Sequence, residues 1–210
     1  MKKVLKKKRF YLLLLCLFLF LLIAILILKN GVLNIDTNSY DFFKKNLINE
    51  SLTPYIKLFT NLGGALLLVL FTLIITFFIK NKKISLAIIL NLIIIFLINE
   101  GLKIIFGRVR PDTINWLVNE RGYSFPSGHS AVSMAYYGFL IYLVYTNFKN
   151  NKCKWLLIFI LSFIILFIGF SRIYLGVHYL SDVLGGFIFS IFYLVIFIYF
   201  YNKFVELWYN

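Results

Sequence analysis

The sequence predicts an all-α integral membrane protein, a bundle of six transmembrane helices. Of the 210 residues, 61% are hydrophobic and only 14% are charged, whereas soluble domains have about 25% charged residues. Residues 10–28, 58–79, 130–148 and 183–202 contain no Asp, Glu, Lys or Arg, and roughly 20 apolar residues in a helix span a bilayer. The composition therefore excludes a soluble enzyme, a disordered chain and a disulfide scaffold.

Six apolar segments are expected to form the spans. They are residues 10–28, 58–79, 84–106, 129–148, 155–175 and 179–201. The first follows a basic start, as in a signal peptide. Its apolar run of 19 residues is longer than the usual signal core, however, and no small-residue cleavage site follows it. We therefore expect this segment to be retained as a membrane anchor.

The longest connection is the segment 29–57 after the first span. Tyr40, Phe43 and Leu47 lie at helical spacing in it, so a short helix at the membrane interface is one interpretation. A plain polar connector is the other, and the sequence leaves both open.

Basic residues cluster between the spans, and their distribution predicts the orientation. The net charge is +14, from 22 Lys and Arg against 8 Asp and Glu, which in a soluble protein would suggest a nucleic-acid partner. With the N-terminus inside, the inner segments hold 13 basic residues and one acidic residue, and the outer segments hold 9 basic and 7 acidic residues. Because short cytoplasmic loops are enriched in Lys and Arg, we expect a cell-membrane protein with both termini cytoplasmic and no nucleic-acid partner.

Five outer basic residues lie in or near the spans and need another explanation: Lys103, Arg108, Arg110, Arg121 and Arg172. Lys103 is followed, after six residues, by Arg110-Pro111. Seven residues make two helical turns, so both cations are expected to project to one side, and Pro111 is expected to end the helix. The alternative is that these cations only snorkel to the membrane surface from a helix end.

The second polar segment is residues 122–130, Gly-Tyr-Ser-Phe-Pro-Ser-Gly-His-Ser, directly before the fourth span. Ser127 is a suitable N-cap, and Gly128 allows a ligand to approach the backbone closely. The free N–H groups and the positive dipole end of a helix N-terminus favour an anion. The alternative is a Pro-Ser-Gly turn in which His129 is incidental.

The third polar segment begins with Ser171-Arg172 and continues with His178 after five residues and Asp182 after three more. His178 and Asp182 are four residues apart, so they can meet on one helix face. A carboxylate beside an imidazole fixes its tautomer and stabilises the cation that forms. A structural His–Asp pair at a helix start is the alternative.

Taken together, the three segments point to one chemistry. They bring three cations, one helix N-terminus, both histidines of the chain and one carboxylate to the ends of spans on the outer side. Cations and N–H donors can bind a phosphoryl group and stabilise the charge of its transfer. One histidine can attack phosphorus, and the other can protonate the leaving oxygen and later activate water.

These residues resemble the pattern of the type 2 phosphatidic acid phosphatase superfamily, which is K-x6-RP, then PSGH, then SR-x5-H-x3-D. All eleven specified residues are present in order and spacing between residues 103 and 182. The flanking residues are most similar to those of phosphatidylglycerophosphatase B-like lipid phosphatases. The resemblance implies a single membrane-embedded phosphatase domain over residues 1–210, with its active site at the outer face of the membrane.

The resemblance also implies a role for each residue. His178 is the nucleophile that forms a phosphohistidine, Asp182 orients it, and His129 is the general acid and then the base for water. The groups that hold the phosphate are Lys103, Arg110, Arg172, Ser127, the backbone N–H of Gly128, and Ser171. Neither a metal nor another cofactor is expected. One departure is Leu180, where many relatives have proline.

Several lipid phosphates fit these expectations equally. Phosphatidylglycerol phosphate, phosphatidic acid and undecaprenyl diphosphate all join a phosphate to an apolar tail. Transfer of the phosphoryl group to another lipid or sugar is a second enzymatic interpretation, and a non-catalytic lipid binder or transporter is a third. Binding alone needs only the cations, so the presence of His129, His178 and Asp182 favours catalysis.

Overall fold

The computed structural model describes residues 2–112 and 116–207, with side chains from residue 7 to residue 205 outside that gap. All regular secondary structure in these residues is helical, which confirms the all-α expectation. The elements are α1 (Lys2–Asn30), α2 (Asn34–Asn46), α3 (Thr53–Thr60), the 3-10 helix η1 (Asn61–Gly63), α4 (Ala65–Phe78), α5 (Lys82–Phe106), α6 (Gly128–Asn147), α7 (Lys152–Tyr174) and α8 (Leu180–Leu207).

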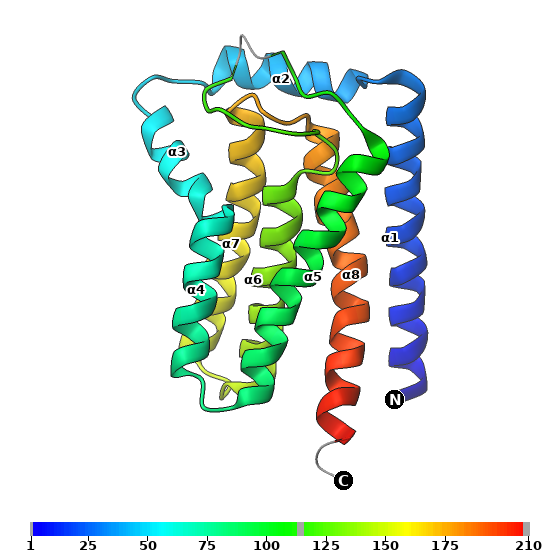
Figure 1. Cartoon of the computed structure of the whole chain (residues 1–210), viewed down its shortest axis with the longest axis vertical. Coiled ribbons are helices and arrows are strands. Elements are labelled where there is room, and N and C mark those ends of the chain that lie inside the picture. The colour runs from blue at the N-terminus through cyan, green and yellow to red at the C-terminus, as the bar shows by residue number, and fades with distance from the viewer. Residues whose placement is uncertain (1, 113–115, 208–210) are drawn as a thin grey trace.

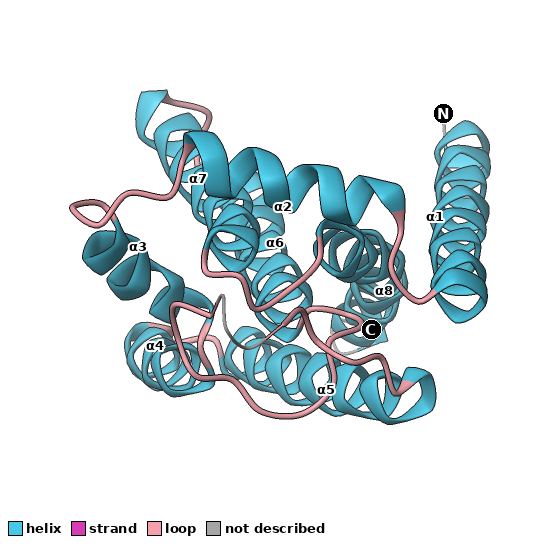
Figure 2. Ribbon diagram, turned by 90° about the horizontal axis from the view of Figure 1, so that it is seen from above, coloured by secondary structure: helices cyan, strands magenta, loops and turns pink. Residues whose placement is uncertain are grey.

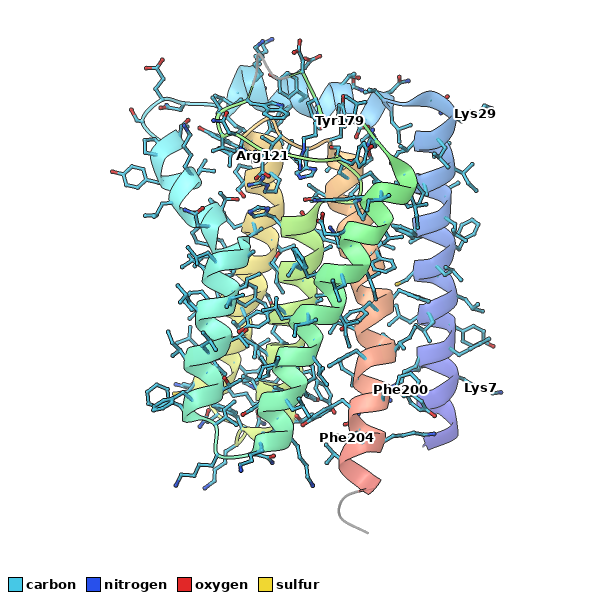
Figure 3. All side chains as sticks on the ribbon, viewed as in Figure 1. Lys7, Lys29, Arg121, Tyr179, Phe200 and Phe204 are labelled. Carbon is cyan, nitrogen blue, oxygen red and sulfur yellow. The ribbon has the colours of Figure 1, made fainter. Side chains whose placement is uncertain are left out.

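The long helices α1 and α4 to α8 run side by side along the molecule, and α2 lies across one end of the bundle (Figure 1). The start of α1 and the end of α8 both lie at the opposite end. Helix α6 stands in the middle, where it packs against α5, α7 and α8, while α1 packs against α8 at the edge (Figure 2). Among the labelled side chains, Lys29, Arg121 and Tyr179 lie at the α2 end, and Lys7, Phe200 and Phe204 lie toward the other end (Figure 3).

The expected count of six spans is only partly supported. Among the residues that the structure describes, four helical segments are long and apolar enough to cross a membrane: Lys7–Asn30, Lys82–Phe106, Lys152–Tyr174 and Leu180–Val205. A fifth candidate is the pair Thr53–Gly63 and Ala65–Phe78, which is bent by 54°. Helix α6 is not among these segments. Its sequence contains Ser130, Ser133 and several tyrosines, and neighbouring helices rather than lipid surround most of it.

The expected span over residues 58–79 corresponds to this bent pair and is not one continuous helix. The chain changes from α3 through η1 to α4, and the break falls where Gly64 has an extended backbone (φ −80°, ψ 147°). Gly63 lies at this break against α7, where a Cβ atom would come within 2.8 Å of Ile168 Cγ2 and 3.4 Å of His129 Cδ2. The break therefore brings the backbone at Gly63 next to His129. A larger side chain at this position would prevent that approach.

The segment 29–57 forms helices rather than a plain connector. Helix α2 packs against α7 and α8, and Phe43 and Leu47 join the apolar cluster of Tyr174, Leu175 and Val177 beneath it. The loop between α5 and α6 also lies over this end, where Ser124 N donates to Arg108 O at 2.8 Å and Leu117 N donates to Leu175 O at 3.0 Å. These contacts fix the loop and the turn before α8 above the ends of the central helices.

Candidate active site

A cavity of about 350 Å³ lies below the α2 end of the bundle and joins a polar region to an apolar one. Its polar lining consists of Asn99, Glu100, Lys103, Arg110, Glu120, His129 and His178, together with Gly128. Its apolar lining comes mainly from α4 and α5 and includes Leu68, Val69, Leu92, Ile93, Phe96 and Leu97. Residues from all three sequence motifs therefore meet at one cavity.

Lys103 and Arg110 reach this cavity from different elements. Lys103 lies in the last turn of α5, where its Nζ is 3.0 Å from Glu100 Oε1. Helix α5 ends at Phe106, because Gly107 adopts a left-handed conformation (φ 55°) that favours glycine. The helix thus ends at Phe106, before the expected end at Pro111, and Arg110 lies in the loop, but both cations line the same cavity.

Arg110 is held in the loop by backbone carbonyl groups. Its guanidinium donates to Gly122 O at 2.9 Å, Arg121 O at 2.9 Å and Val177 O at 3.0 Å. The same guanidinium lies 3.0 Å from His178 Nε2 through Nη1. Since arginine can only donate, Nε2 accepts this hydrogen bond and carries a lone pair, so the proton of a neutral His178 ring lies on Nδ1.

His178 lies in the turn before α8, and its Nδ1 faces Asp182. The distance from Nδ1 to Asp182 Oδ2 is 3.4 Å. Ser124 Oγ contacts both groups, at 2.5 Å from Oδ2 and 3.4 Å from Nδ1. The turn is closed by Tyr179 N, which donates to Asp182 Oδ2 at 2.8 Å, so it forms with Leu180 in place of proline.

The environment of His178 favours the neutral ring. The pKa of His178 is lowered to about 4, mainly by burial and also by the charges of Arg110 and Arg172, against the opposing effect of the Asp182 carboxylate. The imidazole is therefore uncharged at neutral pH. Its Nε2 keeps a lone pair, which can attack an electrophile once Arg110 exchanges its hydrogen bond to Nε2 for another acceptor.

His129 is placed by the start of α6. Ser127 is the N-cap as expected, and its Oγ accepts from Ser130 N at 3.5 Å and from Ser130 Oγ at 3.0 Å. A Cβ atom on Gly128 would lie 3.2 Å from Asn99 Nδ2 and 3.4 Å from Lys103 Nζ. The glycine thus lets the Lys103 ammonium group approach the N-terminus of α6 beside His129.

Arg172 and Ser171 are also expected to bind phosphate, but they lie deeper in the bundle than Arg110 on the loop. Arg172 is 1% exposed, and its Nη1 donates to Thr60 Oγ1 at 3.1 Å. Ser171 Oγ lies 2.6 Å from Ile168 O and 2.8 Å from Thr60 Oγ1, within hydrogen-bonding distance of both. Neither these two residues nor Ser127 is part of the cavity lining, so the structure brings them near the cavity without exposing them in it.

Glu120 is a site residue that the sequence interpretation missed. Its Oε1 accepts a short hydrogen bond from Arg172 Nη2, and its Oε2 lies 3.9 Å from Arg110 Nη2. This carboxylate lines the cavity and bridges two of the three cations predicted to bind phosphate. Its loop position shows no periodicity in the sequence, so only the fold reveals it.

Arg108 and Asp36 form a second group that the sequence interpretation did not place in the site. Arg108 Nη1 donates to Asp182 Oδ1 at 2.5 Å, and its Nη2 donates to Asp36 Oδ2 at 2.7 Å. Asp182 is 0% exposed and Asp36 is 1% exposed. The unexplained outer cation Arg108 therefore lies behind His178, in contact with the carboxylate that faces its ring.

Comparison with known proteins gives a family match over the motif region. The family model of the PAP2 superfamily matches residues 62–206, which contain all three motifs. The chain is 42% identical over 92 residues to phosphatidylglycerophosphatase B of Bacillus subtilis (strain 168), in an alignment covering 43% of this chain and 45% of that protein. It is 27% identical over 187 residues to undecaprenyl-diphosphatase of Sulfolobus acidocaldarius, covering 86% of this chain and 85% of that protein. The matched region thus spans less than half of the first relative and most of the second.

Two crystal structures share the fold. A transmembrane PAP2-type phosphatidylglycerolphosphate phosphatase from Bacillus subtilis superposes with a TM-score of 0.81 at 30% identity, over 92% of this chain and 97% of that chain. LpxE of Aquifex aeolicus superposes with a TM-score of 0.60 at 26% identity, over 81% of this chain and 96% of that chain. Together with the apolar helices, the first similarity shows that the chain is a multi-span membrane protein.

Proposed function

Because the chain belongs to the PAP2 superfamily, we propose that it is a membrane lipid phosphatase that hydrolyses a lipid phosphate or diphosphate. One observation carries the proposal. The cavity that holds Lys103, Arg110, His129 and His178 continues into an apolar channel between α4 and α5. A lipid phosphate has the same two parts, an anionic group joined to an apolar tail.

The apolar part of the cavity reaches the outer surface of the bundle. Val69 on α4 and Ile93 and Leu97 on α5 line it, and they are 48%, 48% and 61% exposed respectively. In a membrane protein these exposed apolar side chains face lipid. A tail can therefore lie between α4 and α5 while its phosphate lies among the cations, so the substrate does not have to leave the bilayer.

The first chemical step is attack of His178 Nε2 on phosphorus. A bond forms between Nε2 and phosphorus, the bond from phosphorus to the lipid oxygen breaks, and His129 donates a proton to that oxygen. Arg110 is hydrogen-bonded to Nε2 at 3.0 Å, so its guanidinium exchanges this contact for a phosphate oxygen as the substrate binds. Lys103 and Arg172 stabilise the remaining negative charge.

The second step is hydrolysis of the phosphohistidine. His129 accepts a proton from water, the water oxygen bonds to phosphorus, and the phosphorus–nitrogen bond breaks to release inorganic phosphate. Asp182 keeps the Nδ1 proton of His178 in place through both steps and stabilises the positive ring while phosphorus is attached. The three cations do the work that a metal ion does in many phosphatases, so neither a metal nor another cofactor takes part.

We place the site at the extracytoplasmic face of the cell membrane. The charge distribution supports this orientation, as does the location of the start of α1 and the end of α8 at the end of the bundle away from α2 (Figure 1). Single cysteines at the exposed positions 121 and 151, in a variant without Cys16 and Cys153, test it with an impermeant thiol reagent on intact cells. We expect labelling at 121 only. Labelling at 151 alone would reverse the orientation.

The substrate is tested by phosphate release from a panel of lipid phosphates in detergent micelles. The named relatives make phosphatidylglycerol phosphate and undecaprenyl diphosphate the first candidates, with phosphatidic acid as the third. We expect one free phosphate for each lipid consumed, also in the presence of EDTA, and none with His178→Ala. Consumption of lipid without free phosphate would indicate transfer to another acceptor. A loss of activity in EDTA that magnesium reverses would contradict the proposed role of the cations.

A further inference from the structure

Three charged side chains from distant parts of the sequence form a buried row behind His178. They are Asp36 on α2, Arg108 in the loop after α5, and Asp182 in the first turn of α8. Their side chains are 0%, 4% and 0% exposed. The row joins the helix that lies across the outer end of the bundle to the carboxylate that faces the His178 ring.

Arg108 is held in one orientation by its full set of partners. Nη1 donates to Ser181 Oγ at 2.8 Å in addition to Asp182. Nε and Nη2 both donate to Gly31 O, at 3.2 Å and 2.9 Å, and the guanidinium lies 4.3 Å from the centre of the Tyr179 ring. A cation that only snorkelled to the membrane surface would keep its head group in water, so snorkelling does not explain Arg108.

Asp36 fixes the other end of the row. Its Oδ1 accepts from Ser181 N at 2.9 Å, and its Oδ2 accepts from Ser181 Oγ at 2.9 Å and Leu33 N at 3.1 Å. Asp36 thus caps the N-terminus of α8 from a different helix, which suits a carboxylate near the positive end of a helix dipole. Through Arg108, the same carboxylate is tied to Asp182.

We propose that Arg108 and Asp36 are positioning residues of the proposed phosphatase reaction, which hold Asp182 and balance its charge so that His178 stays neutral and nucleophilic. The inference rests on the proposed function. Arg108 occupies Oδ1 of Asp182 and thereby directs Oδ2 toward His178 Nδ1. Its positive charge opposes protonation of the ring, and the negative charge of Asp36 offsets part of that effect. Breaking either buried pair leaves an uncompensated charge close to His178.

The charge of His178 also depends on groups from the other elements around it. They are Asp36 and Tyr40 from α2, Glu100 and Lys103 from α5, Arg108, Arg110, Asp112 and Glu120 from the loop after α5, His129 from α6, Arg172 from α7, Tyr179 beside His178, and Asp182 from α8. Substitution of Arg108 or Asp36 leaves the other groups in place. A difference between the two variants therefore reports the charge of this pair alone.

Removing the charge of Arg108 and removing the charge of Asp36 should shift the pKa of His178 in opposite directions. In Arg108→Gln, two uncompensated carboxylates stabilise the imidazolium ion, so the pKa of His178 rises, by roughly one unit or more. In Asp36→Asn, Arg108 keeps its charge without the offset, so the pKa of His178 falls below about 4. The double variant restores the balance and returns the pKa toward its original value. If Arg108 and Asp36 had a purely structural role, the pKa of His178 would shift in the same direction in all three variants.

The experiment reads the ring directly by NMR and does not depend on activity. The chain has two histidines, so a His129→Gln parent without a histidine tag leaves His178 as the single reporter. Selectively labelled histidine is titrated in the full chain in micelles, in the parent and in the parent carrying Arg108→Gln, Asp36→Asn, or both. Arg121→Gln and Asp41→Asn are matched controls, because both side chains are exposed, and they should leave the pKa unchanged.

The same substitutions in the protein with His129 intact give the kinetic counterpart. The acidic limb of kcat/KM for lipid phosphate should move to higher pH with Arg108→Gln, and to lower pH with Asp36→Asn. If Arg108→Gln does not fold, Arg108→Lys should keep the parent pKa while Asp36→Asn still lowers it. Shifts in the same direction, or no shift in either single variant, would overturn the inference. If the two single variants shift the pKa of His178 in opposite directions but the protein with His129 intact releases no phosphate, only the proposed function is contradicted.

Discussion

The two sides of the His178 ring are built differently. On the cavity side, Lys103 is 12% exposed and has an ion pair with a neighbour in its own helix, and Glu120 is 22% exposed. On the opposite side, Ser124 and Asp182 are 0% exposed. There the Asp182 carboxylate accepts from Arg108, Ser124 and Tyr179 N in addition to facing the ring.

This difference separates binding from activation. Lys103 and Glu120 on the cavity side have few and replaceable partners, so a phosphate can take over contacts there at low cost, whereas Arg110 is held by backbone carbonyl groups. Groups on the buried side are saturated, and leaving one of them unpaired costs about 1–3 kcal/mol. We therefore expect substitutions of the phosphate-binding groups on the cavity side to change KM and inhibitor affinity, and substitutions on the buried side to change kcat. His129 lines the cavity but transfers protons, so its substitution should also change kcat.

The largest effect is expected for His178→Ala, which removes the group between the two sides. Phosphate release should fall to background on every substrate, because no phosphohistidine can form. Acid quenching after incubation with labelled substrate should trap an acid-labile phosphoenzyme in the unmodified protein and none in the variant. A phosphoenzyme trapped in His178→Ala would place the nucleophile elsewhere.

On the buried side, Asp182→Asn should lower kcat by roughly 10³–10⁴-fold. The Asn amide can donate to Nδ1, which moves the ring proton to Nε2 and removes the nucleophilic lone pair. KM and the inhibition constant of inorganic phosphate should change little, because Asp182 is not part of the cavity lining. A large change in phosphate affinity with an unchanged kcat would break the distinction between the two sides.

On the cavity side, His129→Ala should lower the rate on lipid esters by about 10²–10⁴-fold. A lipid alkoxide needs a proton to leave, whereas an aryl phosphate such as p-nitrophenyl phosphate leaves readily without one. The variant should therefore keep a larger fraction of its activity on the aryl ester, and His178→Ala serves as the control that loses both. Equal losses on both esters would remove His129 from the role of general acid.

A smaller effect of opposite sign is expected for Glu120→Gln. Its carboxylate bridges Arg110 and Arg172, so a phosphate oxygen must displace an anion to reach them. Neutralising it should tighten inhibition by inorganic phosphate and vanadate by about tenfold, equivalent to about 1.4 kcal/mol. Glu50→Gln, in the exposed connection between α2 and α3, is the matched control. Weaker inhibition in Glu120→Gln would mean that the carboxylate organises the arginines instead of competing for them.

The smallest effect concerns pH. With the pKa of His178 lowered to about 4 by burial, nearly all of the ring is neutral at pH 5.5. To remove the general acid from the profile, the measurement uses His129→Ala with p-nitrophenyl phosphate, whose leaving group needs no proton. After separate correction for ionisation of the substrate, kcat/KM of this variant should change less than about twofold between pH 7 and 5.5. A ring with the ordinary pKa of about 6.5 would lose about tenfold over the same range, and such a loss would show that the buried side does not keep the ring neutral.

Sequence spacing was sufficient for the residues whose partners are close along the chain. The Ser127 N-cap and the contact of His178 with Asp182 follow from local geometry, and the motif residues Lys103, Arg110, Gly128, His129 and His178 lie at one cavity. Glu120 and Asp36 could not be found in this way, because Glu120 meets Arg172 and Asp36 meets Arg108 across long sequence separations. Those contacts depend on how the loop and α2 fold over the bundle.

Hydrophobicity predicts the helices at the edge of the bundle well, and the helices at its centre less well. Helix α1 consists almost entirely of apolar residues over its spanning part and was evident at once. The break at Gly64 was missed, because the residues 58–79 are uniformly uncharged and their composition contains no signal for a bend of 54°. Helix α6 is the opposite case. It contains polar side chains, yet it lies inside the bundle, where it contacts α5, α7 and α8.

The composition of α6 has a consequence for biogenesis. A helix that carries Ser130, Ser133 and several tyrosines gains little by entering lipid alone, so its insertion depends on α5, α7 and α8, which cover it. Helices α7 and α8 are synthesised after α6, and α6 also carries His129. A nascent chain should therefore keep its catalytic groups apart until α8 has emerged from the ribosome, and the site should become complete only in the last stage of membrane insertion.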